Sequence, residues 1–139
     1  MRPSLAGLLL LAAGILSSPV LAQESAVDPI DATLATCLAE PGASGTADSV
    51  ACFAAARDAW EKEVTRAYFA LSMTLDARSR GILRGAQKQW EAYLAAERRF
   101  QAASWTRQHG PDIAVTLASQ DAELFKARAL TLRNYKPGG

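Results

Sequence analysis

The chain is poor in the residues that build β-sheets and catalytic sites. After residue 22 it has four valines and three isoleucines against 25 alanines, and its only histidine is His109. Alanine has the highest helix propensity and β-branched residues favour strands, so this composition predicts an all-α protein. One histidine and two cysteines also leave little material for a metal site or a catalytic constellation. We therefore expect no cofactor, no metal and no enzymatic activity.

Long hydrophobic runs are absent except at the N-terminus. Leu5 to Leu16 is apolar and follows Arg2, the only charged residue among the first 22, and Val20-Leu21-Ala22 resembles a cleavage site. This pattern predicts a secretory signal peptide over residues 1–22. The apolar run is too short to remain as a membrane anchor, and no cysteine directly follows the cleavage site to carry a lipid. We expect a periplasmic or secreted protein with one helical domain over residues 23–139.

A charge surplus of either sign is also missing. Removing Arg2 from the 15 basic residues leaves 14, which equals the number of acidic residues, so residues 23–139 carry no formal net charge. Nucleic-acid binding needs clustered positive charge. We therefore expect no nucleic-acid partner.

The chain has only two cysteines, Cys37 and Cys52. In an exported protein, an even count favours a disulfide. Closing a loop of this length stabilises the fold by about 3 kcal/mol in the chain-entropy model. A redox-active pair is the alternative, but it lacks the usual spacing of two residues between the cysteines.

Apolar residues recur at intervals of three and four, which is typical of amphipathic helices. The first two predicted helices cover residues 31–39 and 48–75. Asp76 is a favourable N-cap for a third helix ending near Trp105, residues 106–112 form a loop around Gly110-Pro111, and the last helix covers residues 113–134. Because the turn at Asp76 is so short, the two long helices should form an antiparallel hairpin. The short first helix, tied by the disulfide, and the last helix would cover this hairpin in a small helical bundle.

Two charged residues, Glu97 and Arg128, interrupt apolar stripes of the predicted helices. A buried charge is costly unless paired, so they are expected to meet in a buried polar network that Gln87 could join. The alternative is that a small helix rotation places them on the surface. Gly81 and Gly85 indicate either fraying of the third helix or the close approach of another backbone.

Five residues are candidates for contact with a partner. Arg78 and Arg80 lie in the turn between the long helices, while Trp105, Arg107 and His109 lie at or beyond the end of the third helix. Exposed tryptophan and arginine are frequent in binding hot spots. The alternative interpretation is that the arginines and His109 are simply solvated. The other aromatic residues of the helix seams are expected in the core: Trp60, Tyr68, Trp90, Tyr93 and Phe100.

Three sequence features together resemble the LprI-type lysozyme inhibitor N-terminal domain family. They are the Cys37…Cys52 pair, the segment Ala59-Trp60-Glu-Lys-Glu63-Val64-x-x-x-Tyr68-x-x-Leu71, and the segment Leu83-x-x-Ala86-Gln87-x-x-Trp90-x-x-Tyr93-x-x-x-Glu97. The resemblance covers roughly residues 34–133 and implies a small, exported, helical bacterial protein. The family usually has a second disulfide, whose positions are occupied here by Arg98 and Ser119-Gln120.

The resemblance implies a periplasmic protein-binding domain that inhibits lysozyme or a related peptidoglycan hydrolase. One alternative is an envelope interaction or immunity protein with a non-lysozyme partner. Another is a structural or stress-related periplasmic protein. The sequence leaves the oligomeric state open.

Overall fold

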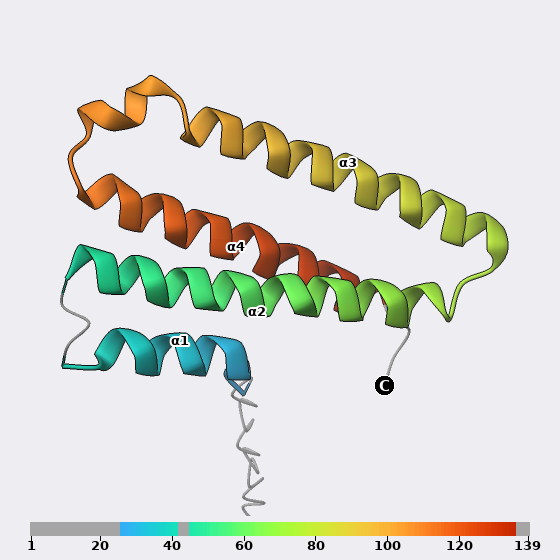
Figure 1. Ribbon diagram of the computed structural model, residues 1–139. Helices are drawn as coiled ribbons and strands as arrows, with labels where there is room; N and C mark the ends of the chain where they lie inside the picture. The colour runs from blue at the N-terminus through green and yellow to red at the C-terminus, as the bar shows by residue number, and fades with distance from the viewer. Residues whose placement is uncertain (1–25, 42–44, 136–139) are drawn as a thin grey trace, which may run out of the picture.

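The computed structural model describes residues 26–41 and 45–135, so the predicted signal peptide lies outside the described residues. Within these ranges the chain is helical and contains no strand, which confirms the all-α prediction. The elements are α1 (Pro29–Ala39), α2 (Thr46–Ser72), α3 (Ala77–Gln101), the short 3₁₀ helix η1 (Ser104–Gln108) and α4 (Asp112–Asn134) (Figure 1).

The starts of α3 and α1 follow from their capping residues. The Asp76 carboxylate accepts hydrogen bonds from the backbone N–H groups of Arg78 and Ser79, so α3 begins where the sequence predicts. Asp28 caps α1 in the same way through the N–H of Ile30, and α1 therefore begins two residues before its predicted start at residue 31.

The predicted end of the third helix near Trp105 is wrong, because α3 stops at Gln101. The Trp105 indole N–H donates to the Phe100 carbonyl over 2.8 Å, which satisfies a carbonyl that a longer helix would bond internally. The chain then enters η1, which occupies part of the segment expected to be an irregular loop.

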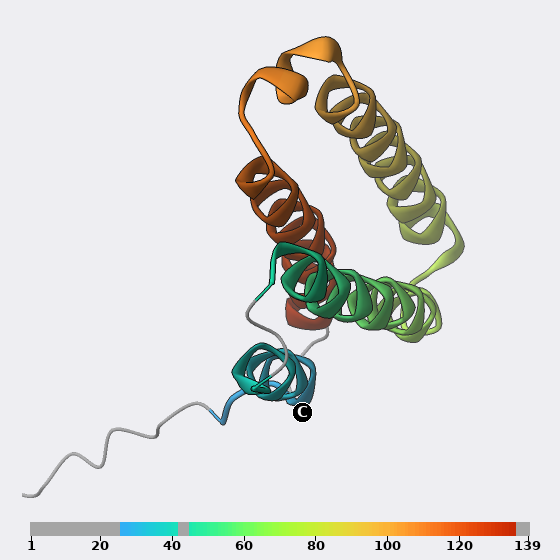
Figure 2. The same cartoon turned by 60° about the vertical axis from the view of Figure 1, so that its left-hand side comes forward.

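The four helices form the predicted bundle, in which α2 and α3 run in opposite directions from the turn at Asp76 (Figure 1). The closest backbone packing is between α2 and α4, with α1 packed on α2. By contrast, α3 diverges from α2 beyond the turn and stands away from the α2–α4 pair in both views (Figures 1 and 2). It therefore reaches the core through a few side chains only.

The core lies mainly between α2 and α4, with Trp60 and Phe125 as its largest fully buried side chains. From α3, which has 25 residues, only Leu83 and Leu94 are buried. The core cluster contains Trp60, Val64, Ala67, Leu71, Leu83, Leu94, Phe125, Ala129 and Leu132.

Two sequence expectations about α3 are wrong. Tyr93 and Phe100 were expected in the core, but their side chains are exposed because α3 stands away from α4. Gly81 and Gly85 neither fray the helix nor admit another backbone. Both lie within regular α3, and a methyl group added at either would meet no atom within 4 Å.

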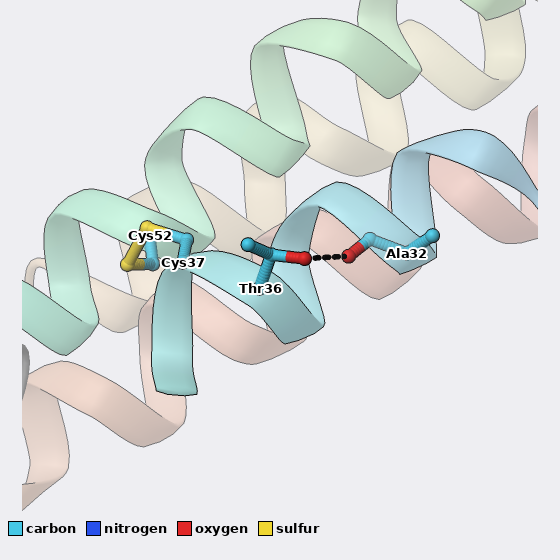
Figure 3. Close-up of a disulfide and its surroundings, with 4 residues drawn as sticks. All are labelled: Ala32, Thr36, Cys37 and Cys52. Carbon is cyan, nitrogen blue, oxygen red and sulfur yellow. Dashed lines mark hydrogen bonds between the residues drawn. A yellow bond between two sulfur atoms is a disulfide. The ribbon is translucent and has the colours of Figure 1, made fainter. Parts of the chain in front are cut away.

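Cys37 and Cys52 form the predicted disulfide, with their Cα atoms 5.8 Å apart (Figure 3). The bond joins the last turns of α1 to the first turns of α2, and Cys52 is buried. Just before Cys37, the Thr36 hydroxyl donates to the Ala32 carbonyl within α1. The disulfide therefore fixes the C-terminal end of α1 against α2.

Reduction of this disulfide is expected to lower the free energy of unfolding by about 3 kcal/mol and to lower the melting temperature. Helices α2 and α4 should stay helical, because the core between them lies outside the loop that the disulfide closes. Thermal circular dichroism with and without reductant measures both effects, with the Cys37→Ser/Cys52→Ser double variant as the control. An unchanged melting temperature would show that the bond does not stabilise the fold, and free thiols in the unreduced denatured protein would refute the pairing.

Candidate interaction site

The five predicted contact residues fall into two groups at opposite ends of α3. Arg78 and Arg80 belong to its first turn, whereas Trp105, Arg107 and His109 lie in and just after η1 at the far end (Figure 1). At 1.5 Å of rise per residue, the stretch of α3 from Arg80 to Phe100, on which Trp105 stacks, separates the groups by about 30 Å. They are therefore two separate candidate surfaces.

The first surface, the basic corner (Arg78 and Arg80), has a structural explanation for one of its arginines. The Arg80 guanidinium donates to the Leu75 carbonyl over 3.1 Å, which satisfies a backbone acceptor in the turn after α2. Ser79 donates its N–H and hydroxyl to Asp76, and these bonds, together with the Arg78 N–H, lower the pKa of Asp76. Within the described part of the chain, the Arg78 side chain forms no hydrogen bond or ion pair and is exposed.

The second surface is the aromatic tip (Phe100, Trp105 and His109). The rings of Phe100 and Trp105 are stacked with their centroids 5.0 Å apart, and the His109 ring meets Trp105 edge-on at 5.2 Å. Two further bonds hold the tip: the Trp105 indole N–H donates to the Phe100 carbonyl, and His109 Nδ1 lies 2.9 Å from the Trp105 carbonyl. The three rings are thus fixed relative to one another and to the end of α3.

The aromatic tip is accessible and carries positive charge around it. Phe100 is 59% exposed and Trp105 is half-buried by its neighbours in the tip. Arg107 is exposed beside it and forms no hydrogen bond or ion pair with another described residue, while the Arg99 guanidinium donates to the Ala95 carbonyl. Gly110 follows with φ +70°, a conformation that favours glycine, and lets the chain turn into α4.

Phe100 is the member of this site that the sequence interpretation missed. It was assigned to the core because it continues the helical repeat of Leu83, Trp90 and Tyr93. Its position could have indicated its place in the site, because Phe100 lies directly before the end of α3, beside a loop that contains a second aromatic residue.

The expected ion pair between Glu97 and Arg128 is wrong. Arg128 donates through Nε and Nη2 to the Gln87 side-chain carbonyl at 3.1 and 2.9 Å, so the expected Gln87 contact is present without Glu97. At the level of Glu97, its neighbour Arg98 pairs with Asp121 of α4. Arg128 lies seven residues beyond Asp121, about 10 Å farther along α4, so its guanidinium is out of reach of the Glu97 carboxylate.

A different polar network, centred on the buried Glu63, lies between α1, α2 and α4. Arg133 of α4 donates from Nε to Glu63 and from Nη1 to Asp28, both over 2.6 Å, and its guanidinium lies 5.4 Å from the Trp60 ring centroid. Arg66 adds two hydrogen bonds to the same Glu63 carboxylate. Glu63 is therefore a buried, paired charge.

The network shifts the pKa values of its carboxylates downward. The hydrogen bonds from Arg66 lower the pKa of Glu63, burial opposes them, and Arg133 lowers it further. For Asp28, burial raises the pKa, but the bonds from Arg133 and the Ile30 N–H outweigh it. Both carboxylates are thus held in the charged form, and the network joins the N-terminal end of α1 to the core.

Comparison with known proteins identifies the family. Residues 37–132 match the family model described as "Lysozyme inhibitor LprI". The chain belongs to the LprI family. The match includes both cysteines of the disulfide, Glu63 and both candidate surfaces of this LprI-family protein, whereas Asp28 and Arg133, which complete the Glu63 network, lie just outside it. No curated protein and no solved structure matches the chain.

No helix among residues 26–41 and 45–135 is long and apolar enough to cross a membrane. The same part of the chain holds no group of three or more acidic, histidine or cysteine side chains arranged to bind a metal ion.

Proposed function

We propose that this protein is an exported inhibitor of lysozyme, located in the periplasm or secreted, that acts as a protein-binding domain without chemistry of its own. The observation that carries the proposal is the LprI family match over residues 37–132. The signal-peptide pattern of residues 1–22 supports export.

The aromatic tip is the surface that we assign to enzyme contact. Its rings are held in place before binding by the stacking of Phe100 on Trp105 and by the indole hydrogen bond, so little side-chain entropy is lost on association. Rigid aromatic anchors of this kind dominate the binding energy of many interfaces. At the basic corner, by contrast, Arg80 is engaged with its own backbone.

The charge around the tip suits the active site of a glycan hydrolase. Such enzymes carry two catalytic carboxylates in a cleft. Arg107 is exposed, and a guanidinium can donate two parallel hydrogen bonds to one carboxylate. Although residues 23–139 carry no net charge, the local positive charge of Arg99 and Arg107 can orient the tip toward an acidic cleft.

The test is lysis of a bacterial cell-wall suspension, followed as the loss of turbidity, by lysozymes of several types with increasing amounts of the oxidised protein. We expect dose-dependent loss of activity of at least one lysozyme type, with unchanged inhibition after the protein has been dialysed free of small molecules. Full lysozyme activity at saturating protein would contradict the proposal and favour a non-lysozyme envelope partner.

A further inference from the structure

The divergence of α3 leaves a groove between α2 and α3 that has no part in the proposed enzyme contact. Two adjoining hollows of about 310 and 380 Å³ lie along it. They share Val64 and Thr65 of α2 and Gln87 and Glu91 of α3, so together they form one continuous groove, here called the α2–α3 groove. Each hollow falls in the size range of small-molecule sites.

Aromatic and apolar side chains line the inner part of the α2–α3 groove. Trp90 and Tyr68 are half-buried in its lining, and the buried residues Val64 and Phe125 lie beside them. Trp90 is fixed by an edge-on contact with Phe125, at a centroid distance of 5.4 Å, and by the Arg128 guanidinium 5.8 Å from its ring centroid. The groove therefore offers rigid ring surface to a ligand.

A chain of hydrogen bonds fixes polar groups on the same surface. Arg128 holds the Gln87 side-chain carbonyl with two donors, which turns the Gln87 amide nitrogen toward Glu91, 3.3 Å away. Burial lowers the pKa of Arg128, whose hydrogen bonds within the described chain go to this neutral amide. The Gln87 amide donates one N–H to Glu91, so its second N–H and the remaining acceptor sites of the Glu91 carboxylate lie side by side. This is the pair that a hydroxyl group needs, because it both donates and accepts.

The charges around the groove indicate the class of ligand. Arg84 and Lys88 are exposed in the first hollow, and Arg98, which pairs with Asp121, is exposed in the second. The carboxylates of Glu61 and Glu91 also lie among the lining residues. A polyanion would meet these carboxylates, and an apolar helix would leave charges of both signs desolvated without partners. A neutral, hydroxyl-rich ligand with flat apolar faces fits both the paired polar groups and the rings.

We propose that the α2–α3 groove binds a neutral oligosaccharide, with sugar faces on Trp90 and Tyr68 and hydroxyl groups on Gln87 and Glu91. This site is separate from the aromatic tip. Only the choice of test sugar rests on the proposed function, since lysozymes cleave β-1,4-linked amino-sugar chains. The probe is therefore chitotetraose, a neutral oligomer of N-acetylglucosamine.

The experiment is a titration of the ¹⁵N-labelled protein with chitotetraose, in the absence of lysozyme, to about 10 mM, which covers millimolar dissociation constants. The three tryptophan indole signals report on three places: Trp60 on the core, Trp90 on the groove and Trp105 on the tip. We expect the Trp90 indole and the Gln87 side-chain amide to shift saturably, while Trp60 and Trp105 stay in place.

Matched variants of α3 locate the site. Glu91→Ala should weaken chitotetraose binding about tenfold, because it removes a charged hydrogen-bond acceptor from the groove. Glu97→Ala removes a carboxylate six residues farther along α3, where Glu97 lines a hollow on the α4 side, and should leave the affinity unchanged.

Three outcomes would overturn the proposal: no shift at the highest chitotetraose concentration, shifts at Trp105 alone, or equal weakening of binding by both variants. If poly-L-glutamate bound to the same groove more strongly than chitotetraose, the assignment of a neutral ligand would be overturned. Because no enzyme is present, none of these outcomes bears on the inhibition itself.

Discussion

Replacement of Trp105 by alanine is expected to weaken lysozyme inhibition about 30-fold, as expected for the loss of a binding hot spot. The substitution removes the ring that stacks on Phe100 and the indole N–H that bonds to the Phe100 carbonyl. It therefore removes an anchor and also releases the segment that carries Arg107. The measurement is the inhibition constant against the lysozyme type that the unaltered protein inhibits most strongly.

Two further variants separate binding from folding. Ile82→Ala is the control for truncation of an exposed apolar side chain. Ile82 is 66% exposed, similar to the 59% of Phe100, but it lies at the opposite end of α3, so this variant should leave inhibition unchanged. Trp105→Phe keeps an aromatic ring but loses the indole hydrogen bond, and should have an intermediate effect. Because Trp105 lies outside the core cluster, all three variants should retain the helical circular dichroism spectrum. Equal inhibition by Trp105→Ala and the unaltered protein would remove the tip from the interface.

Arg133→Met is expected to lower the free energy of unfolding by about 2 kcal/mol. Breaking a fully buried ion pair costs about 3–5 kcal/mol, and the partial exposure of Arg133 reduces this cost. The variant leaves Asp28 without its arginine and Glu63 with only one, and it removes the cation from above Trp60. Urea unfolding followed by circular dichroism gives the free-energy change.

Arg66→Met is the matched control, since it removes the other guanidinium that binds Glu63. The Arg66 side chain is 66% exposed, whereas that of Arg133 is 31% exposed. An exposed ion pair contributes about 0–1 kcal/mol, so this variant should lose much less stability. Equal losses for the two variants would contradict the assignment of Arg133 as the central residue of the network.

The same network predicts how stability depends on pH. The pKa of Glu63 is lowered from its ordinary value of 4.5, and that of Asp28 from 3.8. A carboxylate with a lowered folded-state pKa contributes stability that is fully present above the unfolded-state value and is lost as the pH falls through the folded-state value. The free energy of unfolding should therefore decrease below about pH 4.5, and Glu63→Gln should make this decrease shallower. A decrease of the same steepness in Glu63→Gln would show that Glu63 does not contribute.

The sequence was sufficient to predict the features of the fold that depend on local pattern. The spacing of Trp60, Val64 and Leu71 marks the buried face of α2, and the Asp76 carboxylate fixes the start of α3. The cysteine count predicted the disulfide because only one intramolecular pairing exists. Each of these predictions depends on residues that are close together in the chain or, for the disulfide, on a pairing that has no intramolecular alternative.

The features that depend on how helices are placed against one another could not be predicted in the same way. Glu97 and Arg128 both interrupt apolar stripes, but only the relative register of α3 and α4 shows that Arg128 bonds to Gln87 without Glu97. Tyr93 and Phe100 have core spacing and are nevertheless exposed, because helical periodicity does not reveal how far α3 stands from its neighbours. Glu63 could have been found, since it lies three residues after Trp60 and four before Ala67 on the buried seam.

Hydrogen–deuterium exchange of the protein with and without saturating lysozyme tests the assignment of the aromatic tip most directly. Backbone amides that become buried in a complex exchange more slowly, and the method compares every part of the chain in one experiment. We predict slower exchange over residues 100–109 and unchanged exchange in the turn that contains Arg78 and Arg80. Slower exchange in that turn, with none at the tip, would contradict the account.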